Sequence, residues 1–305
     1  IQEKTDTDII RKLDTIYSPG TYMAVDKNDK ISNNVCCVWM ETFKRKNKEF
    51  LVYGVSIIDI ITGKSYIFEH EVEYSMNPTT FDELERIMTT FSPSEIILLS
   101  AMDKRDINTI FNFVNAPNVI TQCISLEHEK AVNCSKQKYI HHILGTFFGE
   151  DCIFRCKEFD NYAMATQSFC FLLNFIQEHN YYLTQHIDFP LFNNHSKRMV
   201  LANHTLSQLN IICDGQHSGE FGSVSSFLNK CITPMGRRDF GYNMTNPIFD
   251  KEMLQSQYDN LEIFVNNQCV PEIRILLKSV KDLEKIVRLI VMKKAYPSHL
   301  YHIYN

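Results

Sequence analysis

Residues 222–247 force a sharp change in the direction of the chain. The residue before a proline is pushed out of the α region, so Thr233 should be extended and should end a first short helix. Pro234 suits the first turn of a second helix, with the Thr233 hydroxyl as its N-cap, and Asn246 with the proline after it should close that helix. The stretch therefore predicts two helices joined at a corner, with Gly236 where a neighbouring backbone comes close.

Two arginines follow this corner directly, at Arg237 and Arg238. We expect their guanidinium groups to reach polar partners or helix C-termini nearby rather than DNA. In the alternative interpretation the arginines neutralise phosphates, and their removal then lowers the salt dependence of DNA binding.

The first half of the chain has the pattern of an α/β domain. Three apolar runs separated by turn residues predict a β-meander. After it, the spacing of apolar residues predicts a helix, a strand, a second helix and a fifth strand. Three meander strands followed by α-β-α-β is the order of an RNase H-like fold. The predicted strands are residues 35–43, 50–60, 65–71, 95–100 and 119–125, and the predicted helices are residues 81–91 and 103–114.

A turn sequence marks the start of this domain. Residues 1–16 are predicted to be a linker. Tyr17 is followed by Ser-Pro-Gly-Thr, which puts Pro19 and Gly20 at the central positions of a type II turn. The α/β domain should therefore cover residues 17–154.

The rest of the chain, residues 159–305, is predicted to be a mostly α-helical domain. Residues 162–175 are strongly apolar but too short, and too interrupted by polar residues, to span a bilayer, so they predict a buried core helix. A long helix is expected from Ile273 to about Lys294.

Four cations recur on one side of this long helix, at Lys278, Lys281, Lys285 and Arg288. One interpretation is a phosphate-facing surface, which makes these residues the candidates for DNA contact. The other is a solvated face balanced by Asp282 and Glu284. The second interpretation is favoured.

Catalytic and metal-binding patterns are weak. A two-metal nuclease of RNase H-like fold holds one of its carboxylates on the first strand. Asp59 instead ends the second predicted strand and opens an Asp-Ile-Ile-Thr-Gly turn. Glu69 and Glu71 have the pattern of solvated hairpin-edge residues. The scattered His141, His142, Cys152 and Cys156 fit no zinc-binding spacing. We therefore predict no catalytic residue and no metal site here, and leave open whether the whole protein is an enzyme.

Composition adds three exclusions. The net charge of −5 gives no global basic footprint. Ten cysteines without a Cys-x-x-Cys pair favour free thiols in a reducing compartment over a disulfide scaffold. No Gly-x-x-x-x-Gly-Lys-Ser/Thr loop is present, so no ATP site and no other cofactor is expected within these residues.

The corner carries a specific resemblance. The motif that carries it is Gly-Ser-x-x-x-x-Leu-Asn-x-x-x-Thr-Pro-Met-Gly-x-Arg. This motif resembles the start of the core, or lever, domain of the MutS family of DNA mismatch-repair proteins. Residues 201–211, 258–264 and 280–286 resemble family segments in the same order. The departures are Asn203, Gln208-Leu209-Asn210 and Asn243-Met244, where the family usually has Asp, Asn-Leu-Glu and Trp-Leu.

The resemblance implies a domain for each part of the chain. Residues 1–16 would be the linker from an N-terminal mismatch-reading domain, and residues 17–154 the RNase H-like connector. Residues 159–305 would be the N-terminal half of the helical core, cut off before the clamp and the ATPase. This segment would couple the ATPase state to the grip on DNA. The full-length protein would bind mismatched double-stranded DNA through other domains, use ATP and Mg²⁺, and form a homodimer.

Two other functions and several locations stay open. One alternative is an RNase H-like nuclease fused to a helical domain, and another is a non-catalytic interaction module derived from MutS. The bias toward Ile, Asn, Phe, Tyr and Lys suits an AT-rich gene and resembles the mitochondrially encoded MutS of octocorals, with large-virus MutS proteins close behind. A mitochondrion is therefore expected, otherwise cytoplasm, nucleus or viral factory, with no secretion and no membrane partner.

Overall fold

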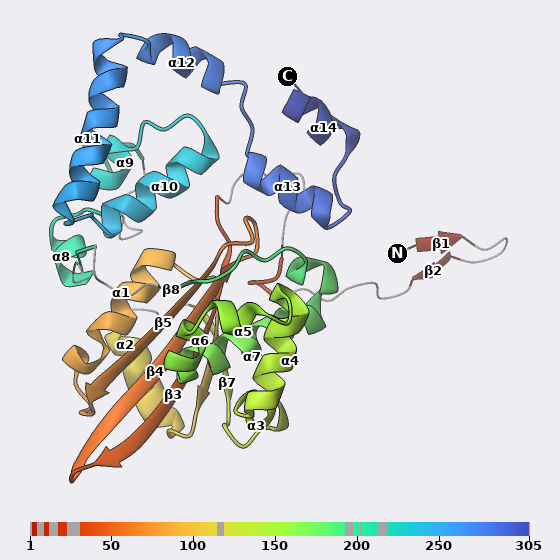
Figure 1. Ribbon diagram of the computed structural model, residues 1–305, viewed down its shortest axis with the longest axis vertical. Helices are drawn as coiled ribbons and strands as arrows, with labels where there is room; N and C mark the ends of the chain where they lie inside the picture. Colours follow the sequence, from red (N-terminus) through yellow and green to blue (C-terminus); the bar gives the residue numbers. More distant parts are fainter. Residues whose placement is uncertain are drawn as a thin grey trace.

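A six-stranded mixed sheet organises the first half of the molecule (Figure 1). The computed structural model describes residues 2–4, 9–11, 18–22, 31–114, 119–192, 198–199, 201, 203–212 and 219–304. The strand order is β7-β6-β3-β4-β5-β8. The strands are β3 (Asn34–Arg45), β4 (Lys48–Asp59), β5 (Ser65–Glu73), β6 (Glu95–Ser100), β7 (Ile120–Ile124) and β8 (Leu191–Phe192).

The meander and its two parallel additions follow the predicted order. Strands β3, β4 and β5 are antiparallel neighbours, and β6 and β7 add in parallel beside β3. Lys46 and Asn47 turn the β3–β4 hairpin with positive φ angles of 48° and 62°, as a two-residue hairpin of this twist requires. The crossover helices are α1 (Asp82–Phe91), preceded by the 3₁₀ turn η1 (Pro78–Phe81), and α2 (Lys104–Phe113).

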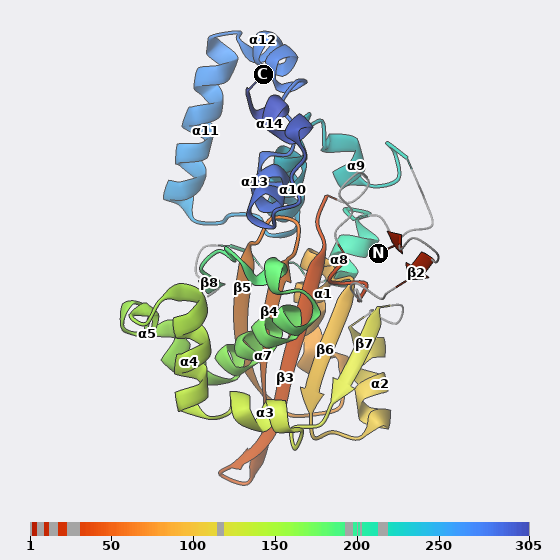
Figure 2. The same ribbon diagram turned by 90° about the vertical axis from the view of Figure 1, so that its right-hand side faces the viewer.

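Each face of the sheet has its own apolar core, because side chains alternate along a strand. On β3, Cys37 and Trp39 join the cluster on one face, whereas Cys36 and Val38 join the other. Figure 2 shows α7 (Ala163–His179), α3 (Glu129–Cys134) and α4 (Gln137–Phe148) on the first face and α1 and α2 on the second. The sheet is therefore the middle layer of three, as an α/β domain requires.

Helix α7 packs on the sheet through a close backbone approach. A Cβ on Gly54 of β4 would lie 2.2 Å from the Ala165 backbone nitrogen, so only glycine fits there. The Ala165 N–H donates to Glu69 Oε2 at 2.9 Å, and Ser168 Oγ donates to the Cys37 carbonyl at 2.7 Å. This helix was expected to open the second domain at residue 159, and the packing instead joins it to the sheet. Glu69 caps α7 and is not a solvated edge residue.

The N-terminal segments differ from the expected linker and turn. Strands β1 (Gln2–Lys4) and β2 (Ile9–Arg11) form a small antiparallel pair inside the predicted linker. The Thr21 N–H donates to the Ser18 carbonyl at 3.1 Å, which closes a turn. Gly20 is not among the glycines with positive φ, so the prediction of a type II turn was wrong. Tyr17 lies outside the described residues.

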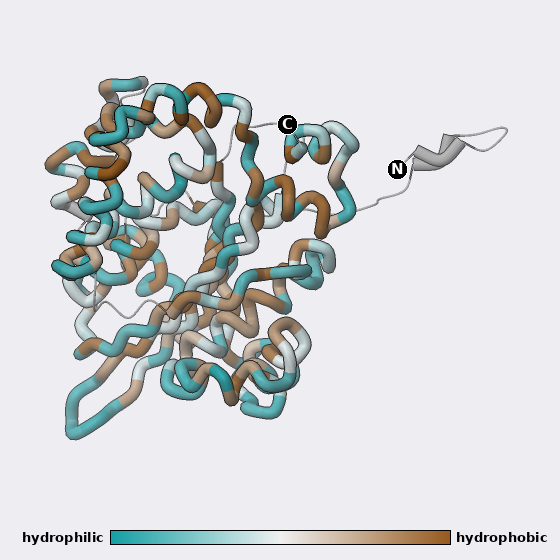
Figure 3. The backbone as a smooth tube through the Cα atoms, turned by 45° about the horizontal axis from the view of Figure 1, so that its top comes forward, coloured by the Kyte–Doolittle hydropathy of each residue, from teal (hydrophilic) through white to brown (hydrophobic). Residues whose placement is uncertain are grey.

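Helices make up the remainder and lie beyond one end of the sheet (Figure 1). Two short helices, α5 (Cys152–Arg155) and α6 (Glu158–Asn161), connect α4 to α7, and the 3₁₀ turn η2 (Tyr181–Thr184) follows α7. Then follow α8 (Asn203–Gln208), α9 (Val224–Leu228), α10 (Pro234–Thr245), α11 (Lys251–Asn266), α12 (Val270–Leu277), α13 (Leu283–Val291) and α14 (Pro297–Tyr304). The predicted succession of a sheet domain and a mostly helical region is confirmed. Figure 3 shows apolar segments on the outer helices and a hydrophilic tip on the β3–β4 hairpin.

The predicted long helix from Ile273 to Lys294 was wrong. Helix α12 ends at Leu277, where the following N–H groups bond only three residues back. Asp282 then starts α13 as its N-cap, with its carboxylate accepting from the Lys285 N–H at 3.2 Å. This capping bond stabilises the start of a separate helix, so the helical spacing of apolar residues does not continue from α12 into α13. Within the described parts of the chain, no helix is long and apolar enough to cross a membrane.

The packing at Gly54 predicts a large loss of stability for Gly54→Val. Valine favours strands, so the loss must come from the clash with the α7 backbone, and we expect more than about 3 kcal/mol by chemical denaturation. Gly241→Ala in α10 is the matched control, because its added Cβ meets nothing within 4 Å. That variant should be neutral or up to about 1 kcal/mol more stable. Equal losses in both variants would contradict the close approach.

Candidate functional site

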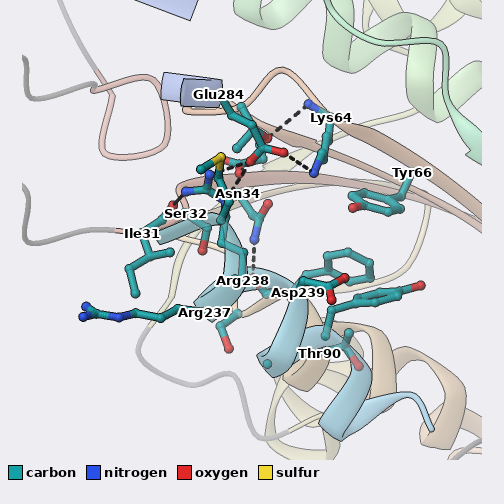
Figure 4. Close-up of a pocket in the computed structure, with 18 residues that line it drawn as sticks. Ile31, Ser32, Asn34, Lys64, Tyr66, Thr90, Arg237, Arg238, Asp239 and Glu284 are labelled. Atoms are coloured by element: carbon teal, nitrogen blue, oxygen red, sulfur yellow. Dashed lines mark hydrogen bonds and ion pairs between the residues drawn. The ribbon is translucent and has the colours of Figure 1, made fainter. Parts of the chain in front are cut away.

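A cavity of about 660 Å³ lies where the end of the sheet meets α10 and α13 (Figure 4). We call this region the junction. Its walls come from the start of β3, the β4–β5 turn, the end of α1, the first turns of α10 and the start of α13. Its main polar residues are Asn34, Asp59, Lys64, Arg238 and Glu284.

The predicted corner builds one wall of the junction. Thr233 is extended, with φ −84° and ψ 147°, and its hydroxyl accepts from the Gly236 N–H at 3.2 Å. Pro234 occupies the first turn of α10. A Cβ on Gly236 would lie 3.2 Å from Thr233 Oγ1 and 3.4 Å from Cys231 Cβ. The helix corner and its cap are confirmed, but the atoms nearest to Gly236 belong to the side chains of Thr233 and Cys231, so the expected approach of a neighbouring backbone was wrong.

Arg238 holds three parts of the chain together. Its two terminal nitrogens donate to the two carboxylate oxygens of Asp282 at 2.7 Å each, in a fork-to-fork pair. It also donates to Glu284 Oε2 and, at 2.9 Å, to the Ile31 carbonyl. Glu284 Oε1 accepts from Lys64 Nζ at 2.7 Å. We call these four charged side chains the junction network, and it joins α10, α13 and the β4–β5 turn.

The contacts in the junction network shift the pKa values of Arg238, Asp282 and Glu284. Burial raises the pKa of Asp282, but hydrogen bonds and attraction from Arg238 outweigh burial and hold that pKa below its usual value. Burial likewise raises the pKa of Glu284, while hydrogen bonds from Lys64 and Arg238 lower it overall. Burial lowers the pKa of Arg238, but its carboxylate partners raise it. All three groups are therefore charged at neutral pH.

A second arginine, Arg288, attaches α13 to the sheet domain. Arg288 is 2 % exposed and donates to the carbonyls of Leu183, Gln185, His186 and Ile60. Burial lowers the pKa of Arg288 to about 10, and the nearby Asp59 and Asp188 carboxylates oppose this. Arg288 therefore ties together backbone segments that lie far apart in the sequence.

The structure divides the four cations that the sequence puts on one stripe. Lys285 and Arg288 are buried, at 7 % and 2 % exposed. Lys278 and Lys281 are exposed and lie between α12 and α13. The four residues thus do not share one surface. Contact of Lys278 and Lys281 with DNA stays a prediction.

Asp59 has the role of a turn residue. Its Oδ1 accepts from the N–H groups of Asn33 and Ile61 at 3.0 Å, and its Oδ2 accepts from Thr62 Oγ1 at 2.9 Å. Glu71 is exposed and pairs with Arg45. In the described part of the chain, no three His, Cys, Asp or Glu side chains are grouped to hold a metal ion. The structure thus does not bring the candidate ligands of the nuclease or of a zinc site together.

An aromatic wall completes the junction and was not predicted. The Tyr66 ring lies 4.7 Å from that of Phe91 and 6.2 Å from that of Tyr242, measured between centroids. These residues come from β5, α1 and α10, so no local pattern links them. The site thus has a charged end and an aromatic end, and its paired ions position elements rather than activate a nucleophile.

Arg238→Met should destabilise the chain by about 2 kcal/mol at pH 7, because two partly buried carboxylates lose their partner. Because the pKa values of Asp282 and Glu284 are lowered, the junction network stabilises the folded chain at pH values above the ordinary carboxyl pKa. This stabilisation is lost as the pH falls through the lowered pKa values. The difference in the free energy of unfolding between wild type and variant, measured by urea denaturation, should therefore become smaller below about pH 4. Lys48→Met, which removes an exposed pair with Glu73, should cost at most about 1 kcal/mol. A gap that widens in acid would contradict the assignment.

Gly236→Val should cost roughly 1–3 kcal/mol, because the new side chain crowds the capping hydroxyl of Thr233. Pro234→Ala should cost less than about 1 kcal/mol, since alanine tolerates the same helical start. Thermal or chemical unfolding of both variants measures the difference. A greater loss in the alanine variant would contradict this account of the corner.

Comparison with known proteins adds independent information. A family model described as MutS domain III matches residues 204–305. A putative DNA mismatch repair protein of the MutS type from Acanthamoeba polyphaga mimivirus is 25% identical over 315 residues, covering 94% of this chain and 28% of that protein. The DNA mismatch repair proteins MutS of Caldanaerobacter subterraneus and Halothermothrix orenii are 24% and 25% identical and cover 95% and 92% of the chain.

These relatives are much longer than this sequence, which spans 28–30% of their length. They include a viral protein, and they give no support to the expected mitochondrial location. The domain III match over residues 204–305 and the relatives that align along nearly all of the chain together support its placement in the MutS family.

Proposed function

We propose that this chain is a segment of a MutS-type DNA mismatch repair protein and that it couples the ATPase state of the whole protein to its grip on DNA. The names of the relatives support the first part, since they are described as DNA mismatch repair proteins. The junction supports the second part. A relay needs elements that move as rigid bodies and a defined contact between them.

The junction network is the observation that carries the coupling proposal. Glu284 on α13 accepts a hydrogen bond from Lys64, and Arg238 on α10 donates to the same Glu284 carboxylate. Lys64 belongs to the turn that follows β4. A shift of α10 or α13 therefore pulls on the end of the sheet through charged contacts. Arg288 adds a second attachment of α13 through four backbone carbonyls.

The finer domain assignment belongs to the same proposal. The sequence predicts a connector of RNase H-like fold at residues 17–154 and the first half of a core, or lever, domain at residues 159–305. We keep both assignments but place α7 with the connector. The strand order supports the first assignment: three meander strands with two parallel strands added beside the first. The packing of α7 on the sheet favours a boundary further along the chain than residue 159.

The partners proposed for the whole protein are mismatched double-stranded DNA and a second copy of the protein. ATP and Mg²⁺ are proposed as its cofactors, but the 305 residues contain no phosphate-binding loop of the Gly-x-x-x-x-Gly-Lys-Ser/Thr type. No step of the relay is therefore assigned to ATP at these residues. The nuclease alternative has less support, because the Asp59 carboxylate accepts hydrogen bonds from its own turn and from the Asn33 N–H.

The Lys64–Glu284 pair offers a test in which coupling separates from stability. Lys64 is 43 % exposed, so Lys64→Met should cost at most about 1 kcal/mol. In the whole protein that contains this segment, it should weaken the release of mismatched duplex caused by ATP, by roughly three- to tenfold in rate. Mismatch affinity without nucleotide should stay unchanged.

Two further variants sharpen this measurement. Lys64→Arg keeps the charge and should retain most of the coupling, while Lys48→Met removes an unrelated exposed pair and should have no effect. Stopped-flow release of a fluorescent mismatched duplex after ATP addition gives the rates. Unchanged release in Lys64→Met would refute the relay role of the junction network.

A further inference from the structure

A groove lined by cations runs beside the junction, on its outer side. Arg237, Arg274, Lys278 and Lys281 are exposed and line two cavities of about 470 and 710 Å³. Both cavities have Ile232, Arg237 and Lys278 in their walls, so they adjoin. We call these four cations the basic groove. Figure 4 shows Arg237 extending away from the junction, in contrast to Arg238.

The carboxylates expected to balance these charges are engaged elsewhere. Asp282 faces Arg238 in the fork-to-fork pair, and Glu284 bonds to Arg238 and Lys64. Among the residues that the structure describes, no ion pair joins any of the four cations to a carboxylate. The basic groove is thus positive within a chain whose net charge is −5.

The two arginines are oriented but keep donors for a ligand. Arg237 Nε donates to the Cys231 carbonyl at 3.2 Å, and Arg274 Nη2 donates to the Lys230 carbonyl at 3.1 Å. A guanidinium has five N–H donors, so each retains several for an anion. Planar guanidinium groups match phosphate oxygens in paired hydrogen bonds.

We propose that the basic groove binds the phosphodiester backbone of DNA. Cations distributed along two adjoining cavities suit a chain of phosphates better than a single anion, which needs charges converging on one point. The choice of DNA as the nucleic acid rests on the proposed function. The contact itself does not, because it belongs to these 305 residues and requires no ATP and no mismatch. Arg237 has the nearby polar partner that the sequence predicts, and the proposal adds a contact with DNA that the sequence analysis did not expect.

The test measures binding of the 305-residue chain to a fully paired 20-base-pair duplex by fluorescence anisotropy at increasing salt. Lys278→Gln/Lys281→Gln should weaken binding roughly ten- to a hundredfold at 50 mM salt and reduce the slope of log K against log salt by about 2. The matched control is Lys44→Gln/Lys104→Gln, which removes two exposed lysines from the sheet domain. The control should bind like the wild type.

A second measurement needs no variant. Bound duplex should protect Lys278 and Lys281 from acetylation, read by mass spectrometry, while Lys44 stays reactive. Equal slopes in the two double variants, or equal acetylation with and without DNA, would overturn the proposal. Binding of inorganic pyrophosphate or of polyglutamate with the same loss in Lys278→Gln/Lys281→Gln, but without binding of duplex, would also overturn it.

These outcomes are distinct from those of the relay experiment. A chain that binds duplex through the basic groove but shows normal ATP-dependent release in Lys64→Met would retain this inference and lose the relay. Loss of the groove contact with intact dependence on Lys64 would do the reverse.

Discussion

The fork-to-fork pair of Arg238 and Asp282 is the interaction on which the meeting of sheet and helices depends. Two hydrogen bonds in one plane fix orientation as well as distance, which a lysine could not do. The pair also neutralises Asp282, the N-cap of α13, and so leaves the cap in place while its charge is partly buried. The position of α13 follows from that of α10.

Two contacts of opposite character hold the molecule together. Helix α7 meets the sheet through apolar packing and the absence of a side chain at Gly54, a contact with one tight geometry. The junction is polar and charged instead, with side chains that retain partial exposure. Charged contacts of this kind re-form after a displacement more readily than a packed core does. This contrast is what favours the junction as the place where motion is passed on.

The charges near α13 are divided by what surrounds them. Arg288 is desolvated and compensated by backbone carbonyls, so it stabilises the fold. Lys278 and Lys281 lie on the connection that breaks the helix, where their charges stay in water. Because Arg238 pairs with the neighbouring carboxylates, the positive charges of these two exposed lysines are not neutralised by them. Residues 278–288 thus supply both a structural arginine and two of the four cations of the basic groove.

Local rules in the sequence determined a large part of this protein. The alternating apolar runs gave the meander strands, and the proline at 234 with its threonine cap gave the helix corner, because both depend on neighbours in the chain. The sequence motifs around that corner also pointed to the MutS family. Only the tertiary structure decided the pairing of Arg238 with Asp282, the burial of Arg288 and the aromatic wall with Tyr242. Each of these depends on groups more than 40 residues away, whose approach no local pattern encodes.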